Sequence, residues 1–293
     1  MNRMVRGLAV AAMVLAAGGA WATEGGGGAY PSGAEDFMVG ALPPPGDYLV
    51  TYGLYYTADA LMDGGGNELP IDFDLEVAGA VFRYIHVTPK TILGGNWAQH
   101  IFVLLLNQDV TTPAGSDDKF GFGDLIVDPF IIGWHKPPFH YVAGVDIYVP
   151  VGSYDENDMA NLGRNYWTFE PLFAATYLAK CGGEISAKLM YDINLENDDT
   201  GYTSGNEFHM DYLVGWGKGA WKVGANGYAY WQVTEDDAPS GVPENPDGTQ
   251  YGLGPALTYQ KGPVTMTAKW QREFETEGKP EGDRFWLKVI FPF

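Results

Sequence analysis

The chain is poor in cysteine and in positive charge. It has one Cys in 293 residues, and 17 Lys+Arg stand against 37 Asp+Glu, giving a formal net charge of −20. One cysteine, Cys181, excludes a disulfide scaffold and a Cys-rich metal site. The acidic balance argues against a nucleic-acid partner, because binding to phosphates needs clustered Lys and Arg. Charged residues make up only 18% of the chain, which is little for a soluble surface.

Long apolar runs are also absent beyond the first 22 residues. No later stretch approaches the roughly 18 consecutive apolar residues of a transmembrane helix. Aromatic residues are plentiful, at 14% of the chain, together with 40 Gly. This content of aromatics excludes an intrinsically disordered chain. Any membrane role must therefore use strands.

Residues 1–22 have the pattern of a cleaved secretory signal. Arg3 and Arg6 precede a short apolar run, 8–17, and small residues surround Ala22. A basic start, a short apolar core and an A-x-A-like end are typical of export signals. The sequence therefore predicts an exported protein.

Alternation of apolar and polar residues dominates from Asp47 onward, and helical spacing is nowhere sustained. The alternation is clearest over 71–77, 139–147 and 185–195. Period two is typical of strands with two different faces. The chain is predicted to be all-β, with about twelve strands: 48–58, 71–87, 97–107, 122–134, 139–151, 166–179, 184–196, 206–216, 221–234, 250–260, 264–275 and 284–293.

The predicted connections alternate in length and in charge. The short ones carry Lys and no acid, whereas most loop acids lie in the long ones. Transmembrane barrels have short periplasmic turns and long outward loops. The sequence therefore predicts a transmembrane up-and-down antiparallel β-barrel over 47–293, set in the lipid and lipopolysaccharide of the cell outer membrane. The long links are 59–70, 108–121, 152–165, 197–205, 235–249 and 276–283.

The faces of the strands are assigned by parity, with apolar residues toward lipid and polar residues toward the lumen. In the first strand this turns Val50 and Tyr52 outward. Arg83 falls on the outward parity of its strand, so a β-bulge near Gly79-Ala80 is expected to turn it inward. The residues predicted to line the lumen and a solute path are Tyr55, Asp124, Asp128, Trp167, Phe169, Tyr177, Glu207, His209, Asp211, Tyr228, Tyr230 and Gln232.

The last strand alternates down to an aromatic residue. Phe285, Leu287, Val289, Phe291 and Phe293 occupy every second position. Outer-membrane barrels as a class have such an amphipathic closing strand, and its terminal aromatic is read by the barrel-assembly machinery. Phe293 is therefore predicted to contact that machinery.

Residues 23–46 are rich in Gly and Pro and precede the first strand, so no regular element is expected there. Phe37, Met38 and Leu42 give this segment apolar side chains to bury. Two interpretations stand: a plug lodged in the lumen or across its mouth, and a disordered periplasmic tail.

The chain resembles the outer-membrane transporter family named after the meta-pathway of phenol degradation, which includes sphingosine-induced porin-like proteins. The resemblance implies a barrel porin for hydrophobic or aromatic compounds, with no catalytic signature. It is carried by Glu24-Gly25-Gly26, Tyr30-Pro31-Ser32-Gly33, Pro43-Pro44-Pro45-Gly46, Tyr55-Tyr56-Thr57-Ala58-Asp59, Gly121-Phe122-Gly123-Asp124-Leu125, 146–154, 203–211, 227–237 and Gly254-Pro255.

One group of residues could carry acid–base chemistry. Glu207, His209 and Asp211 share the inward face of one strand, but residues two apart are about 6.8 Å apart, too far for a direct dyad. A polar ladder in the lumen is the plainer interpretation, and no enzyme is predicted. A barrel enzyme and a structural or surface-contact protein remain the alternatives to a channel for small hydrophobic solutes.

A second group could bind a metal. Asp72, Asp74 and Glu76 lie on one strand face and offer oxygen ligands of the kind that Ca²⁺ prefers. Bridging to lipopolysaccharide through divalent cations and a plain solvated face are the alternatives. No cofactor is predicted, because no His or Cys spacing resembles a zinc site and no glycine-rich loop opens a helix.

Overall fold

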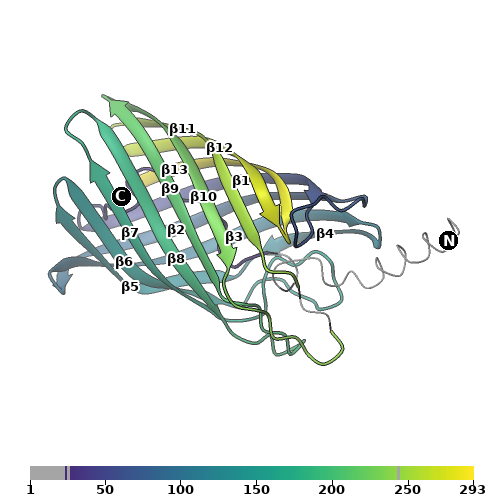
Figure 1. Ribbon diagram of the computed structural model, residues 1–293. Coiled ribbons are helices and arrows are strands. Elements are labelled where there is room, and N and C mark those ends of the chain that lie inside the picture. Colours follow the sequence, from purple (N-terminus) through teal and green to yellow (C-terminus); the bar gives the residue numbers. More distant parts are fainter. Residues whose placement is uncertain (1–23, 25–26, 243–244) are drawn as a thin grey trace, which may run out of the picture.

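The computed structural model describes residues 24, 27–242 and 245–293. The signal sequence predicted for 1–22 lies outside the described residues. Within the described part, no helix is long and apolar enough to cross a membrane. Figure 1 shows tilted strands wrapped into a barrel. The strands are β1 (Gly46–Leu61), β2 (Asp74–Ile92), β3 (Gly95–Thr112), β4 (Gly115–Phe122), β5 (Leu125–Lys136), β6 (Phe139–Val149), β7 (Thr168–Leu178), β8 (Gly183–Asn194), β9 (Glu207–Lys218), β10 (Trp221–Gln232), β11 (Thr249–Lys261), β12 (Val264–Glu277) and β13 (Pro280–Pro292).

The sheet is antiparallel and closes on itself. Apart from β4 and β5, strands that follow one another along the chain pair with each other, and β1 pairs with both β2 and β13. β3 pairs with β4 through its end and with β5 through its start. β4 and β5 therefore share one place in the wall, so the thirteen strands fill twelve positions. The predicted all-β, twelve-stranded up-and-down barrel is confirmed.

Two of the connections predicted to be long are paired strands instead. Within 108–121, β3 and β4 form a hairpin in register from Leu105↔Phe122 to Thr112↔Gly115. Within 276–283, only Gly278 and Lys279 separate β12 from β13. Polar residues suggested loops, but strand ends that project beyond a bilayer lie in water and can be polar.

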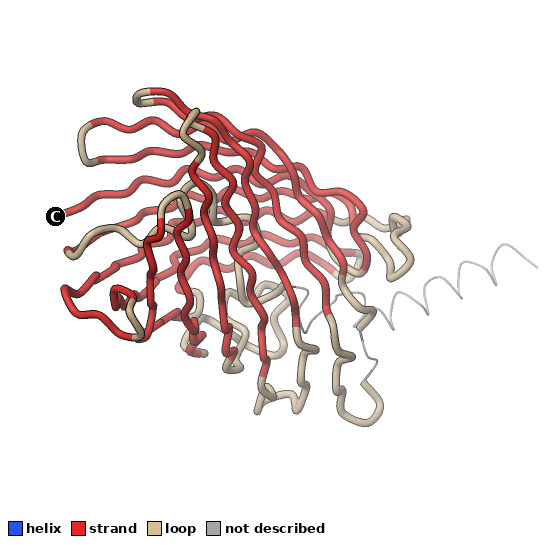
Figure 2. The backbone as a smooth tube through the Cα atoms, turned by 60° about the vertical axis from the view of Figure 1, so that its left-hand side comes forward, coloured by secondary structure: helices blue, strands red, loops and turns tan. Residues whose placement is uncertain are grey.

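The connections between strands lie at two ends of the barrel (Figure 2), which we call the short-turn end and the long-loop end. The short-turn end carries 93–94, 137–138, 179–182, 219–220 and 262–263. The long-loop end carries 62–73, 150–167, 195–206, 233–248 and the two tight hairpins above. This division by length is the one that the sequence predicts.

The outer face of the wall is apolar. Its side chains alternate with buried neighbours along each strand, which is the pattern of a wall that faces lipid. The exposed apolar side chains include Phe82, Tyr84, Ile101, Val103, Phe130, Phe173, Ile185, Leu189, Val214, Trp216, Val223, Leu253, Leu257, Trp270, Phe285 and Leu287.

The parity assigned to the first strand is wrong. Val50 and Tyr52 are buried in a cluster with Ala34 and Leu42 of the N-terminal segment, whereas Tyr55 is exposed. The inner face of β1 is therefore apolar because it packs against protein rather than water. Both faces of this strand are apolar, so polarity alone could not orient it.

The β-bulge expected near Gly79-Ala80 is also wrong. β1 and β2 stay in continuous register from Gly46↔Val87 to Ala58↔Leu75. Arg83 points inward without a register shift and meets Glu35 at 3.0 Å. The parity of this whole strand was inverted, for the same reason as in β1.

Candidate channel lumen

The N-terminal segment, which we define as residues 27–45, runs through the inside of the barrel. Near its start, Glu24 contacts Ser204 and Asn197 in a connection at the long-loop end. Near its finish, the Gly40 N–H donates to Thr176 Oγ1 at 3.0 Å. The chain then enters β1 at the short-turn end. The segment therefore extends along the barrel axis from one end toward the other.

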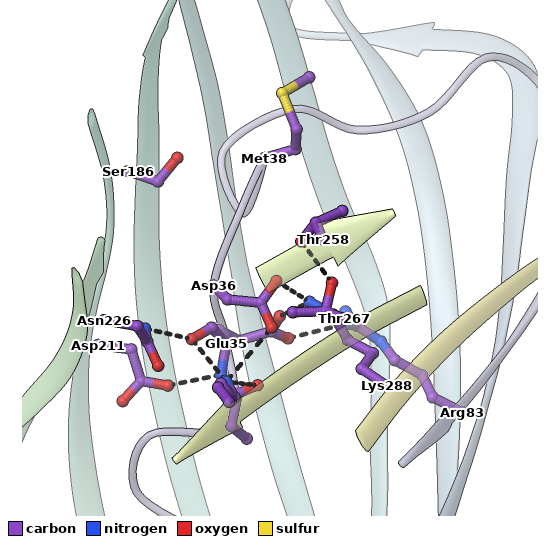
Figure 3. Close-up of polar contacts among 12 residues, drawn as sticks. Glu35, Asp36, Met38, Arg83, Ser186, Asp211, Asn226, Thr258, Thr267 and Lys288 are labelled. Atoms are coloured by element: carbon purple, nitrogen blue, oxygen red, sulfur yellow. Dashed lines mark hydrogen bonds and ion pairs between the residues drawn. The ribbon is translucent and has the colours of Figure 1, made fainter. Parts of the chain in front are cut away.

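Asp211 of β9 holds the middle of the segment (Figure 3). Its carboxylate accepts hydrogen bonds from the Tyr30 hydroxyl at 2.7 Å and from the N–H groups of Gly33 and Glu35, both at 2.8 Å. The Asn226 side-chain amide donates to the Glu35 carbonyl at 3.1 Å. The wall thus satisfies backbone groups that have no secondary structure of their own, as buried backbone requires.

Two buried lysines, Lys269 of β12 and Lys288 of β13, also anchor the segment. Lys269 Nζ donates to the carbonyl oxygens of Gly33 and Ala34, each at 2.6 Å. It also lies 3.3 Å from Asp36, whose carboxylate pairs with Lys288 at 2.5 Å. Removing one partner of a buried pair leaves a charge uncompensated and costs about 3–5 kcal/mol. The Asp36 contacts are therefore a strong attachment of the segment.

Glu35 lies among positive charges that keep it ionised. Its carboxylate pairs with Arg83 at 3.0 Å and lies 3.8 Å from Lys288. Burial raises the pKa of Glu35, but four surrounding cations, Lys288 and Arg83 foremost, outweigh burial and lower the pKa from 4.5 to about 2. The ionised carboxylate therefore stabilises the docked segment.

A lowered pKa fixes the pH range in which the Glu35 contacts act. Their contribution is complete above pH 4.5 and is lost as the pH falls through about 2. We expect channel conductance in planar bilayers to be steady from neutral pH down to about 4.5 and to rise below it as the segment loosens. Glu35→Gln should remove most of this rise. A wild-type curve that rises between neutral pH and 4.5 would contradict this assignment.

Apolar contacts complete the docking of the segment. Phe37 is buried against Leu213 and Ala256, and Leu42 packs against the wall cluster. Met38, in contrast, is 36% exposed. Gly40 passes so close to the wall that a Cβ would lie 2.5 Å from the backbone of Thr176. A larger residue there would push the segment away from β7.

Two cavities lie in the lumen on either side of the segment's middle. One, of about 200 Å³, is lined by 27–32 and by residues near the long-loop end, among them Asp124 and Lys279. The other, of about 680 Å³, is lined by Pro43, Pro44 and residues near the short-turn end. No described residue lines both, so residues 33–36 and the wall around them separate the cavities.

A narrow apolar passage of about 20 Å³ lies between these cavities. It shares Val81, Leu104 and Ile126 with the first cavity, and Tyr52 and Glu35 with the second. On the inner faces of β1, β2, β3 and β5, apolar side chains thus form a strip past the segment, although Arg83 and His100 of β2 and β3 also point inward. The strip consists of Val50, Tyr52, Val81, Leu104 and Ile126. The inner faces of β7, β8 and β9 carry buried polar and charged side chains instead.

Eight of the residues predicted to line the lumen lie on the inner face or at its rim. All are buried, and several contact one another or the segment. Asp128 accepts two backbone N–H groups at 2.7 and 2.8 Å. Tyr228 donates to Glu273 and to Gln250. The eight are Asp124, Asp128, Glu207, His209, Asp211, Tyr228, Tyr230 and Gln232.

The other four predicted lumen residues lie on the outer face. Tyr55, Trp167, Phe169 and Tyr177 are 36–43% exposed, while their neighbours, such as Thr168, are fully buried. Tyr55 packs near Phe285 on the lipid side. Assigning them to the lumen is wrong, because aromatic residues of membrane barrels also gather on the outside near the interfaces.

The three acidic residues considered for calcium lie outside the barrel. Asp72, Asp74 and Glu76 are exposed near the long-loop end, and Glu76 accepts a hydrogen bond from Tyr55 at 3.0 Å. They share no metal-like cluster with another described residue. Calcium binding and contact with lipopolysaccharide stay predictions.

Sequence reasoning missed most of the charged residues inside the barrel. All of them except Glu273, which follows Arg272, share one signal: a charge between two apolar residues within a strand, which marks an inward position in a membrane barrel. Glu170 and Asp192 meet this criterion, and so does Lys188. The missed inner residues are Glu170, Lys188, Asp192, Lys269, Glu273 and Lys288.

Sequence comparison places the chain in a family. The family described as "Putative MetA-pathway of phenol degradation" matches residues 58–289. The chain belongs to this family. It is the same family that the sequence motifs resemble. The match spans nearly the whole barrel. Among curated protein sequences no match was found.

A solved outer-membrane channel shares the fold of this chain, and other solved barrels are less similar. The COG4313 outer membrane channel from Pseudomonas putida F1 is 17% identical, with a TM-score of 0.77, covering 86% of this chain and 97% of that one. The β domain of the Bordetella autotransporter BrkA is 12% identical, with a TM-score of 0.46, covering 85% and 99%. The closed barrel, its apolar exterior and its similarity to the Pseudomonas putida channel show that this protein is an outer-membrane β-barrel with the fold of a channel.

Proposed function

We propose that this protein is an outer-membrane channel for passive uptake of small hydrophobic or aromatic compounds. The observation that carries the proposal is the apolar strip inside the barrel, which links both cavities past the N-terminal segment. A general porin is polar inside. An apolar strip offers a solute that leaves water a continuous surface to contact.

The family and the similar structure support a channel. The family description refers to a pathway of phenol degradation, and the similar Pseudomonas putida protein is titled an outer membrane channel. A route for aromatic solutes into the periplasm fits both. The preference for hydrophobic or aromatic solutes is the part of the proposal that rests on the apolar strip alone.

We further propose that the N-terminal segment is the plug of this channel. Segment 27–45 separates the two cavities and is held by Asp211, Lys269 and Lys288. The narrow passage beside it is far smaller than either cavity. Solutes would therefore cross only along the apolar strip, or after the segment shifts.

Liposome swelling tests the proposal. The folded protein is placed in liposomes, and swelling is measured with aromatic, fatty and sugar solutes of similar size, corrected for protein-free liposomes. We expect the aromatic and fatty solutes to enter several-fold faster than the sugar. Equal rates for all solutes would remove the hydrophobic specificity and leave a general pore. No protein-dependent swelling by any solute would remove the channel.

A barrel enzyme is the weaker alternative. Asp211 is fully engaged by the segment, and Glu207 and His209 are buried beneath it. A substrate would have to displace the segment to reach them. Contact of Phe293 with the barrel-assembly machinery, and contact of the loops with lipopolysaccharide, also stay predictions.

A further inference from the structure

Two clusters of histidine and carboxylate side chains lie buried on the inner face of the barrel. In each cluster, three possible ligand atoms lie within 4.8 Å of one another. Within the described part of the chain, these are the groups with such geometry: His100, Asp128 and Asp146 in one, and Glu170, Asp192 and His209 in the other.

The first cluster is satisfied by the protein itself. Both oxygens of Asp128 accept backbone N–H groups, and His100 Nε2 lies 2.8 Å from Asp146 Oδ1. The Arg83 guanidinium lies 2.8 Å from the other ring nitrogen of His100. A metal ion there would meet occupied ligand atoms and a neighbouring positive charge.

The second cluster is satisfied only at Glu170, which accepts hydrogen bonds from the Tyr148 hydroxyl at 2.7 Å and from Lys188 at 3.2 Å. Both oxygens of Asp192 and both ring nitrogens of His209 lack a hydrogen-bond partner, although the residues are only 0% and 2% exposed. His209 Nε2 lies 3.2 Å from Asp192 Oδ2 and 3.8 Å from Glu170 Oε2. These atoms converge without hydrogen-bond geometry. Buried polar atoms left unpaired are costly and call for a missing partner.

The charges around this cluster also point to a missing cation. Glu207 stands directly opposite Asp192 in the register of β8 and β9, and like charges so placed repel. Lys188 lies 3.2 Å from Glu170, but it also pairs with Asp146 at 3.4 Å. Among the described residues, His209 is therefore the group within ion-pair distance of Asp192, while the positive charge of Lys188 acts on Asp192 from farther away.

We propose that Glu170, Asp192 and His209 bind a divalent transition-metal ion of the Zn²⁺ class. Imidazole nitrogen and carboxylate oxygen are ligands that Zn²⁺ takes, and three protein ligands leave a position for water. Ca²⁺ is disfavoured, because it prefers six to eight oxygens. The ion ties β7, β8 and β9 together below the N-terminal segment, whose Tyr30 ring lies 5.0 Å from the His209 ring.

A competing histidine pair has to be removed before zinc is measured. His135 and His140 are exposed near the short-turn end, with their Nδ1 atoms 2.9 Å apart. Such a pair can bind Zn²⁺ on its own. All chains in the test therefore carry His135→Asn and His140→Asn. His140 pairs with Thr176 of β7, six residues along the strand from Glu170.

The experiment measures zinc bound by the full barrel in detergent. Each chain is stripped with chelator, dialysed against buffered Zn²⁺ and assayed for metal per folded protein. We expect the background chain and Asp128→Asn, the matched control in the satisfied cluster, to bind one ion. Asp192→Asn and His209→Gln should each bind at least about tenfold more weakly, since even outer-shell changes weaken metal binding that much.

Two outcomes would overturn the proposal. Equal zinc binding by the background chain and Asp192→Asn would mean an adventitious ion only. No zinc binding by the folded background chain would leave an imidazolium–carboxylate pair in place of a metal site. If Asp192→Asn does not show the heat-modifiable gel migration of a folded barrel, the test uses Co²⁺ bound to the background chain instead of this variant. The background chain must then give a ligand-field absorption band that Zn²⁺ abolishes, and absence of the band overturns the site.

Discussion

Deletion of residues 24–44 is expected to raise the single-channel conductance several-fold. The segment separates the two cavities, so its removal joins them into one lumen. The barrel should still close, because β1 begins to pair with β2 at Gly46 and with β13 at Tyr48, after the deleted residues. The charges left behind, among them Lys269 and Lys288, would be hydrated by the opened lumen. Planar-bilayer recording measures the change.

The control for this deletion is a change that breaks an ion pair without touching the segment. Arg272→Gln removes the exposed pair of Arg272 with Asp283, 2.9 Å apart near the long-loop end. Its conductance should equal that of the wild type. Unchanged conductance after the deletion, in a barrel that still shows heat-modifiable migration, would contradict the plug.

The architecture could be predicted because a membrane imposes period two on most strands of a barrel. Strands such as β9 alternate polar and apolar residues without ambiguity, so Glu207, His209 and Asp211 were assigned to the inside. The sorting of loops by length needs only turn signals, and it fails only where polar strand ends, within 108–121 and 276–283, resemble loops. Both follow from local pattern, with no knowledge of contacts between distant residues.

The inner apolar strip could not be predicted for a physical reason. Parity assumes that the inside is wet, but β1 and β2 face the N-terminal segment and apolar cavities. Tyr52 and Val81 are therefore apolar and inward, whereas Tyr55 is outward. The contacts that decide this join residues far apart in sequence, such as Glu35 and Arg83. No local pattern contains them.

The N-terminal segment shows the same limit. Its Gly and Pro content predicts irregular backbone, and this holds. Whether such a chain docks depends on partners supplied by remote strands, here Asp211 of β9 and Lys269 of β12. The segment itself offers Glu35 and Asp36 to a lumen rich in buried cations. The segment and the lumen therefore have complementary charges, but only the folded barrel brings these charges together.

Val81→Trp is expected to abolish most uptake of hydrophobic solutes while leaving the barrel folded. Val81 borders both the first cavity and the narrow passage of about 20 Å³. An indole fills that passage and keeps the wall apolar, so the effect is one of space rather than of polarity. Swelling of liposomes with aromatic solutes should fall close to the protein-free rate.

Two comparisons make this result specific to the passage. Val77→Trp, four residues away on the same face of β2, lines only the first cavity and should keep most of the uptake. In a chain that also lacks residues 24–44, Val81→Trp should have little effect, because solute then has the whole lumen. Equal loss from Val77→Trp and Val81→Trp would mean that the passage does not limit entry. A loss that persists without the segment would mean that the route runs along the wall whether or not the lumen is plugged.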